Sequence, residues 1–198
     1  MASPLTVTRN DYHKNPKPSV VNTPLGVARF LCDVLDRTQA STVLDPAIGT
    51  GRLTDPWYDA GRRIVGCDIV DRKARLHHFH LGRYEEMNEI ERPDLVICNP
   101  PFNGCTGRKL YPEVFLEHTF TLFGPTIPAV LFVPMGFRLN QRKKSTRWRW
   151  CRDCGAVLTS IIALPLDIFP GVEFHAEILV FNVRGIRPHY FLTEQALQ

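Results

Sequence analysis

The sequence predicts an α/β protein, with a mostly parallel β-sheet flanked by helices and an antiparallel hairpin at its C-terminal edge. Short apolar, β-branched segments alternate along the chain with stretches of helical periodicity. The last of these segments follow one another closely, which favours the hairpin. A length of 198 residues suits one domain, and 44% hydrophobic with 22% charged residues is the composition of a globular protein.

The expected elements follow the hydrophobic pattern. Thr23 and Pro24 are expected to form the N-cap and the first residue of the first helix. Helices are expected at 25–35, 52–60 and 111–123, and strands at 41–45, 63–68, 94–98, 129–133, 156–164, 177–183 and 189–192. Residues 71–92 have the least distinctive pattern, although His78 and His80 alternate with their neighbours as in a short strand.

The net charge and the N-terminal segment bear on the expected partners and localisation of the protein. A net charge of +4 permits a nucleic-acid partner without requiring one. Residues 1–21 are expected to form an arm and residues 22–198 a single domain. We expect a cytoplasmic protein, because Met1–Asn22 contains no apolar signal core and no apolar run approaches the ~20 residues that span a bilayer.

The cysteines and histidines do not predict a metal site. Six cysteines in a chain without a secretion signal are expected to be reduced thiols. Cys151 and Cys154 have the spacing of metal ligands, but no second pair in the sequence matches them. Three histidines lie close together at positions 77, 78 and 80, and we expect them to be ordinary side chains of a short strand.

A glycine loop follows the first expected strand, in the sequence Asp45-Pro46-Ala47-Ile48-Gly49-Thr50-Gly51. Glycines let the backbone approach a ligand closely. The second strand ends at Asp68, where a carboxylate can accept both ribose hydroxyls of a nucleoside. An acid at Asp45 suits a cationic group on the ligand better than a pyrophosphate. The pattern favours a nucleoside-containing cofactor over a purely steric turn.

The segment Asn99-Pro100-Pro101-Phe102 directly follows a buried strand. Its two prolines fix the backbone and remove two amide donors, so the carbonyls of Asn99 and Pro100 are held as acceptors. The side chains of Asn99 and Phe102 add another acceptor and an aromatic face. Acceptors beside an aromatic plate suit an exocyclic amino group on a planar ring. The alternative is a rigid loop that only terminates the strand.

Together these segments resemble the cofactor and catalytic motifs of the S-adenosylmethionine-dependent DNA adenine-N6 methyltransferases, in the gamma-ordered amino-methyltransferase family of the Asn-Pro-Pro-Phe type. Asn22-Thr23-Pro24 resembles the motif that precedes the glycine loop in that family, and residues 164–169 and 176–181 resemble its late strand-loop-strand motif. The resemblance implies a Rossmann-like class I methyltransferase fold and S-adenosylmethionine as the cofactor.

The resemblance also implies roles for individual residues. The side-chain oxygen of Asn99 and the Pro100 carbonyl would accept hydrogen bonds from the target amine, with Pro101 completing the rigid motif and Phe102 stacking on a flipped base. Thr23 and Asp45 would hold the methionine part of the cofactor, and Asp68 its ribose. The full set of expected cofactor contacts is Thr23, Asp45, Pro46, Ala47, Gly49, Gly51, Asp68, Ile69, Tyr84 and Asn99.

The chain departs from the family in two ways. Arg83 stands where the family usually has a carboxylate that contacts the adenine of the cofactor, so Tyr84 is expected to pack on that ring and Glu85 or Glu86 to replace the acid. Only fifteen residues follow Val183, which leaves no room for a separate target-recognition domain. We therefore expect short or relaxed sequence specificity, or a partner subunit that supplies it.

A basic stretch with interleaved tryptophans is the expected nucleic-acid contact. Its members are Arg138, Arg142, Lys143, Lys144, Arg147, Trp148 and Arg149, followed by Trp150 and Arg152. Phosphate contacts from such a stretch are independent of base sequence, and the partner is expected to be duplex DNA with a flipped adenine or single-stranded DNA. The alternative is a solvated helix face whose tryptophans point inward.

The function expected from the sequence is methyl transfer to the N6 of adenine in DNA, by a bacterial or phage enzyme that protects DNA from restriction. Cytosine-C5 chemistry is excluded, because it needs a thiolate, usually after a proline, and none of the six cysteines follows one. RNA adenine-N6 methylation and protein-glutamine methylation remain as alternatives with the same chemistry. A non-catalytic nucleic-acid-binding subunit that keeps the fold remains as an alternative from another class.

Overall fold

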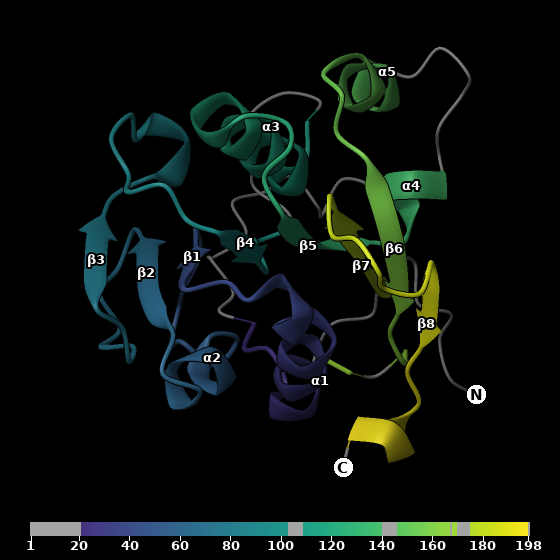
Figure 1. Ribbon diagram of the computed structural model, residues 1–198, viewed down its shortest axis with the longest axis horizontal. Helices are drawn as coiled ribbons and strands as arrows, with labels where there is room; N and C mark the ends of the chain where they lie inside the picture. Colours follow the sequence, from purple (N-terminus) through teal and green to yellow (C-terminus); the bar gives the residue numbers. More distant parts are fainter. Residues whose placement is uncertain (1–20, 103–108, 140–145, 167, 170–174, 198) are drawn as a thin grey trace, which may run out of the picture.

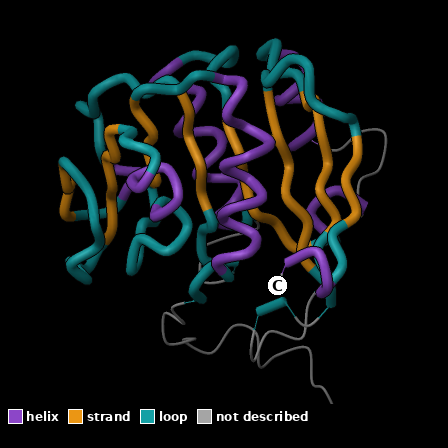
Figure 2. The backbone as a smooth tube through the Cα atoms, turned by 60° about the horizontal axis from the view of Figure 1, so that its bottom comes forward, coloured by secondary structure: helices purple, strands orange, loops and turns teal. Residues whose placement is uncertain are grey.

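A computed structural model describes residues 21–102, 109–139, 146–166, 168–169 and 175–197. Eight strands form one sheet in the order β3-β2-β1-β4-β5-β7-β6-β8. Their bounds are β1 Thr42–Asp45, β2 Arg63–Asp68, β3 His78–Leu81, β4 Leu95–Cys98, β5 Ala129–Pro134, β6 Leu158–Ala163, β7 Ala176–Phe181 and β8 His189–Phe191. Among the described strands, β7 alone runs antiparallel to its neighbours, β5 and β6. Figure 2 shows the strands side by side with helices against them.

Helices cover both faces of the sheet (Figure 1). The α-helices are α1 Leu25–Leu35, α2 Asp55–Asp59, α3 Tyr111–Phe123, α4 Gly136–Leu139 and α5 Thr146–Asp153, and short 3₁₀ turns are η2 Asp36–Thr38, η3 Tyr84–Glu86 and η4 Glu194–Leu197. One face packs against α1 and α2, and the opposite face packs against α3 and α5. No described helix is both long enough and apolar enough to cross a membrane.

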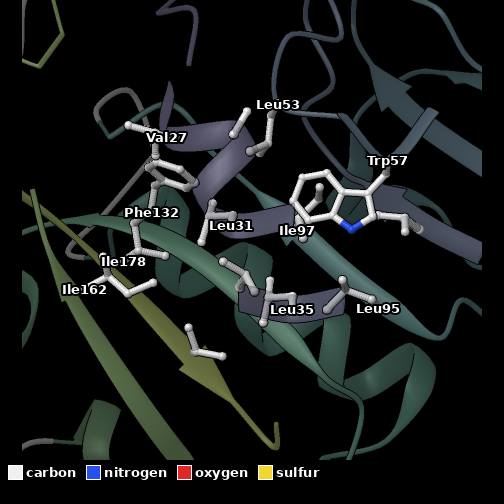
Figure 3. Close-up of a cluster of buried hydrophobic side chains, with 14 of the residues drawn as sticks. Val27, Leu31, Leu35, Leu53, Trp57, Leu95, Ile97, Phe132, Ile162 and Ile178 are labelled. Carbon is white, nitrogen blue, oxygen red and sulfur yellow. The ribbon is translucent and has the colours of Figure 1, made fainter. Parts of the chain in front are cut away.

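Burial on both faces explains why the central strands are almost entirely apolar. Along β4, Leu95 and Ile97 face the α1 side, whereas Val96 and Cys98 face the α3 side. Figure 3 shows the first of these clusters, in which Trp57 of α2 packs among leucines and isoleucines. Side chains alternate across a strand, so each apolar run contributes to two cores at once.

The observed elements confirm the expected fold class and the antiparallel pairing near the C-terminal edge, which β6 and β7 form. The starts of two helices differ from the expectation. Pro24, not Thr23, is the N-cap of α1, and no side chain caps the helix. α2 begins at Asp55 and not at residue 52. β3 forms where His78 and His80 alternate with their neighbours, and it pairs in parallel with β2. The outermost strand, β8, lies parallel to β6.

The topology brings the expected motifs to one edge of the sheet. β2, β1 and β4 are adjacent and parallel, so their carboxyl ends lie together. The chain reverses its winding direction between β1 and β4, and ligands of open α/β sheets bind at such a point. The glycine loop, Asp68 and Asn99 follow β1, β2 and β4 and therefore share this edge.

Candidate functional site

The glycine loop turns sharply away from β1. Gly49 and Gly51 have φ values of 53° and 84°, a region that side chains rarely adopt. The Gly51 amide donates to the carbonyl of Ile48 (2.8 Å), and the Ile48 amide donates to the carbonyl of Cys67 (3.0 Å), which ties the loop to β2. Among the described residues, a Cβ on Gly49 would meet only the Ala47 carbonyl, 3.9 Å away, so this part of the loop is not packed against the described chain. The loop can therefore lie against a ligand.

Asp45 is a buried carboxylate at the end of β1, with only 1% of its surface exposed. Its Oδ1 accepts a hydrogen bond from the Ala47 amide (2.9 Å), and Pro46 beside it is buried. Burial raises the pKa of Asp45 from 3.8 to about 7, a rise to which the negative charge of Asp68 also contributes. A cationic group near Asp45 would favour its ionised form, so this position suits an ammonium or sulfonium group.

Asp68 joins the glycine loop to the segment after β2. Its Oδ2 accepts from the Gly49 amide (2.9 Å), and its Oδ1 accepts from the Val70 amide (3.0 Å) and from Nη1 of Arg72 (2.9 Å). Ile69 and Val70 beside it are large apolar side chains that are 53% and 46% exposed. A carboxylate next to exposed apolar surface suits the ribose and the base of a nucleoside. The pairing with Arg72 had no signal in the sequence.

The Asn99-to-Phe102 segment leaves β4 next to the start of α1. Asn99 donates from Nδ2 to Oγ1 of Thr23 (3.2 Å), and Thr23 is 3% exposed. Pro100 is buried and Pro101 is exposed, whereas Phe102 is half-buried and packs on the edge of the α1-side core. The expected neighbours Thr23 and Asn99 are therefore in direct contact.

Asn22 extends this contact to the glycine loop. Its Oδ1 accepts a hydrogen bond from Oγ1 of Thr50 (2.7 Å). The segment before α1 thus touches both the loop after β1 and the motif after β4. The resemblance placed Asn22 in a motif but did not indicate that contact, which depends on how α1 packs.

Tyr84 does not have the expected role. Its ring is 1% exposed and lies in the core on the α3 side, with ring centroids 5.2 Å from Phe115 and 4.9 Å from His118. Its hydroxyl forms a hydrogen bond with Oγ1 of Thr119 (3.0 Å), and burial raises its pKa. The prediction that Tyr84 packs on the cofactor's adenine is wrong, because α3 already encloses the ring.

The two acids expected to replace the missing carboxylate are bound to Arg83. Glu85 Oε1 accepts from Nη1 of Arg83 (2.9 Å), and Glu86 lies 3.9 Å from the same guanidinium. The three side chains form one charged group after β3. The exposed apolar residues after β2 are therefore the more suitable surface for a base.

The structure describes only part of the basic stretch that is expected to bind phosphate. Arg138 forms an ion pair with Glu177, whose carboxylate lies at the start of β7 and is 2% exposed. Nε and Nη2 of Arg138 lie within 3.4 Å of the Glu177 oxygens. Trp150 stacks on Phe120 of α3, with centroids 5.8 Å apart and planes 20° apart. Arg149 is exposed. The remaining predictions lie outside the described residues or side chains: Arg142, Lys143, Lys144, Arg147, Trp148 and Arg152.

Within the part of the chain that the structure describes, no group of three or more histidine, cysteine or acidic side chains could hold a metal ion. His77 accepts the Ile64 amide on Nδ1 (3.0 Å), which joins β2 to the start of β3. His78 and His80 contact each other, with ring centroids 4.4 Å apart. His78 and His80 are side chains of the edge strand β3, and His77 directly precedes it.

Solved structures show the same architecture. The methyltransferase subunit of a type I restriction-modification system from Streptococcus thermophilus superposes with a TM-score of 0.67 at 15% identity, over 92% of this chain and 52% of that one. A candidate class I S-adenosylmethionine-dependent methyltransferase from Listeria monocytogenes gives 0.66 at 15% identity, over 93% and 69%. The EcoKI M protein, a type I restriction enzyme, gives 0.61 at 18% identity, over 80% and 43%.

These likenesses are likenesses of structure. No protein-family model matches the chain, and no curated protein matches it. The chain spans about half the length of the type I restriction-modification subunits that it matches. The strand order, the antiparallel β7 and these neighbours together show that the chain has the fold of the class I S-adenosylmethionine-dependent methyltransferases.

Proposed function

We propose that this chain transfers a methyl group from S-adenosylmethionine to the exocyclic N6 of adenine in DNA. The observation that supports this most directly is the state of the Asn99 amide. Its Nδ2 is occupied by Thr23, whereas no described residue donates to its Oδ1. This acceptor belongs to the residue that precedes Pro100, at the sheet edge that also carries the glycine loop.

Two hydrogen-bond acceptors beside the target amine would make it a better nucleophile. An aromatic amine is a poor nucleophile, because its lone pair is delocalised into the ring. Hydrogen bonds to Asn99 Oδ1 and the Pro100 carbonyl would favour a pyramidal nitrogen and localise that lone pair toward the methyl donor. Acceptors held in place before the reaction lower its barrier by electrostatic preorganisation and alignment. No covalent intermediate with the protein is needed.

The residues around the glycine loop fit the cofactor. Asp45 supplies a buried anion for the cationic methionine part, and Asp68 keeps acceptor capacity for ribose hydroxyls although Gly49, Val70 and Arg72 already contact it. Gly49 is not packed against the described chain, which leaves room for close approach. When bound, the cofactor supplies an electrophilic methyl group on sulfur. The chain's own contribution is to bind, orient and provide acceptors.

The proposed substrate is DNA, either a duplex with a flipped adenine or a single strand. Likeness to type I restriction-modification subunits supports this choice. We further propose relaxed sequence specificity or a partner subunit that supplies recognition, in the cytoplasm of a bacterium or a phage-infected host. Arg149 and the neighbouring basic residues would supply the contacts to phosphate.

The test is a methylation assay with tritiated S-adenosylmethionine and three substrates: unmethylated duplex DNA, single-stranded DNA and RNA. Asn99→Ala removes the acceptor, and Asn88→Ala removes an exposed asparagine outside the site as the matched control. The expected product after digestion is N6-methyladenine from DNA, absent with Asn99→Ala and unchanged with Asn88→Ala. Label found only in RNA would overturn the proposal that DNA is the substrate. Label in neither DNA nor RNA, although the cofactor binds, would point to a non-catalytic subunit.

A further inference from the structure

We propose that Thr23 is a positioning residue that decides which end of the Asn99 amide faces the substrate. The contact joins Asn99 Nδ2 to Thr23 Oγ1 at 3.2 Å, between residues 76 positions apart. It fixes the amide with its nitrogen turned to Thr23 and its oxygen available. This inference rests on the proposed function, because it concerns the acceptor that would hold the target amine.

Thr23 is well placed to hold a neighbouring group still. It is 3% exposed and is separated from α1 only by the N-cap Pro24, and the apolar face of this helix is buried in the core. Its hydroxyl does not cap that helix, whose first backbone bond runs from the Ala28 amide to the Pro24 carbonyl (3.1 Å). The adjacent Asn22 is tied to Thr50 of the glycine loop. The Thr23 hydroxyl therefore does not cap the helix, and the contacts on both sides of it hold it in place.

Orientation matters because an amide presents a donor at one end and an acceptor at the other. If Asn99 were turned over, its NH₂ group would face the N–H bonds of the target amine, and two donors would oppose each other. The oxygen of Thr23 accepts from Nδ2, so its own proton is available to another acceptor. An anionic group beside Thr23, such as the carboxylate of the methionine part, would accept a hydrogen bond from the hydroxyl, which would then offer only its lone pairs to Asn99.

The inference links cofactor binding to substrate binding. When its hydroxyl donates a hydrogen bond to an anion, Thr23 can only accept from Asn99, and the productive orientation of the amide is then the favoured one. The glycine loop and the Asn99 motif are thereby coupled through Asn22 and Thr23. We expect the cofactor to increase the affinity for a target base, and this increase to depend on the Thr23 hydroxyl.

Two substitutions separate the hydroxyl from the shape of the side chain. Thr23→Val keeps the volume but removes the oxygen, whereas Thr23→Ser keeps the oxygen. At saturating cofactor, we expect the single-turnover rate of methyl transfer to fall about tenfold in Thr23→Val, the effect of one hydrogen bond on the barrier, and to stay near wild type in Thr23→Ser. Thermal unfolding of both variants checks that the fold is retained. An unchanged saturated rate in Thr23→Val would overturn the inference.

A second readout does not depend on activity. The side-chain NH₂ resonances of Asn99, assigned in ¹⁵N-labelled protein by their loss in Asn99→Asp, report the bond to Thr23 directly. We expect them to shift in Thr23→Val and to stay in place in Thr23→Ser. Identical Asn99 resonances in wild type and Thr23→Val would overturn the inference whatever the activity. If instead wild type methylates no substrate while the shift is seen, the proposed function fails and the Thr23 contact stands.

Discussion

Replacing Asp45 by asparagine is expected to stabilise the free protein at neutral and alkaline pH. The carboxyl group is buried, and burial raises its pKa from 3.8 to about 7. An acid with a raised pKa binds its proton more tightly in the folded protein than in the unfolded chain. The bound proton of Asp45 therefore contributes fully to the stability of the folded protein below pH 3.8. This contribution is lost as the pH rises toward 7, and the stability no longer changes through Asp45 at higher pH. Asparagine has no charge to bury, and its Oδ1 can still accept from the Ala47 amide.

The magnitude follows from the two pKa values. They differ by about three pKa units, and at ~1.4 kcal/mol per unit the ionised carboxylate destabilises the folded protein by about 4 kcal/mol. Asp45→Asn should thus match the wild type near pH 4 and exceed its free energy of unfolding by about 4 kcal/mol near pH 8. Because the two proteins share every other titrating group, the difference between them isolates Asp45.

The assay is urea unfolding of both proteins at intervals from pH 4 to pH 8.5, with cofactor absent. The expected result is a gap that widens between pH 4 and pH 7 and is then constant. A gap that does not change with pH would refute the reasoning, because it would mean that Asp45 titrates alike in the folded and unfolded chains. Calorimetry at pH 8 completes the test, since loss of the anion should weaken the binding of S-adenosylmethionine in the variant.

Substitutions at three further positions test the packing of the fold by urea unfolding. Gly66→Ala should destabilise by about 2 kcal/mol through overpacking, because its Cβ would lie 2.5 Å from Cδ1 of Ile48; an unchanged midpoint would mean that the glycine loop yields easily. Asn182→Ala should lower the free energy of unfolding by about 2 kcal/mol, because the Asn182 side chain forms hydrogen bonds with the amide of Val157 and with two carbonyls, and its φ is 61°. Asn182→Gly should recover part of that loss, because glycine adopts this φ without strain but restores no hydrogen bond. Glu177→Leu should lower the free energy of unfolding by about 2 kcal/mol, because it leaves Arg138 without its buried partner. The loss is smaller than for a fully buried ion pair, because Arg138 is partly exposed to water. Equal stability of variant and wild type would show that the ion pair makes no net contribution.

Much of the fold could be predicted from local pattern. The helix at Tyr111–Phe123 has the expected bounds, and strands such as Leu95–Cys98 coincide with continuous apolar runs. Burial of both faces selects such runs strongly, so they stand out in the sequence. The strand at His78–Leu81 does not, because it lies at the edge of the sheet and is held by its pairing with β2 more than by burial.

The candidate site was only partly predictable for a similar reason. Asp45 and Asp68 could be identified because each directly ends an apolar strand, and the topology then brought them to one edge. Tyr84 was misjudged because an aromatic residue in a loop looks the same in sequence whether it faces a ligand or a helix. The ion pair of Arg138 in α4 was not foreseen, because its partner, Glu177, lies 39 residues away in β7.

Local hydrophobic pattern is enough to locate the residues that end the central strands, because apolar runs of defined length report burial locally. The fold class follows from it, as does the presence of an acid, a glycine loop and an asparagine motif at strand ends. The contacts of these residues follow only from the tertiary structure. Asn99 meets Thr23 across 76 positions of chain because α1 packs beside the carboxyl end of β4. A contact of that kind depends on the register and docking of whole elements, which no single segment encodes.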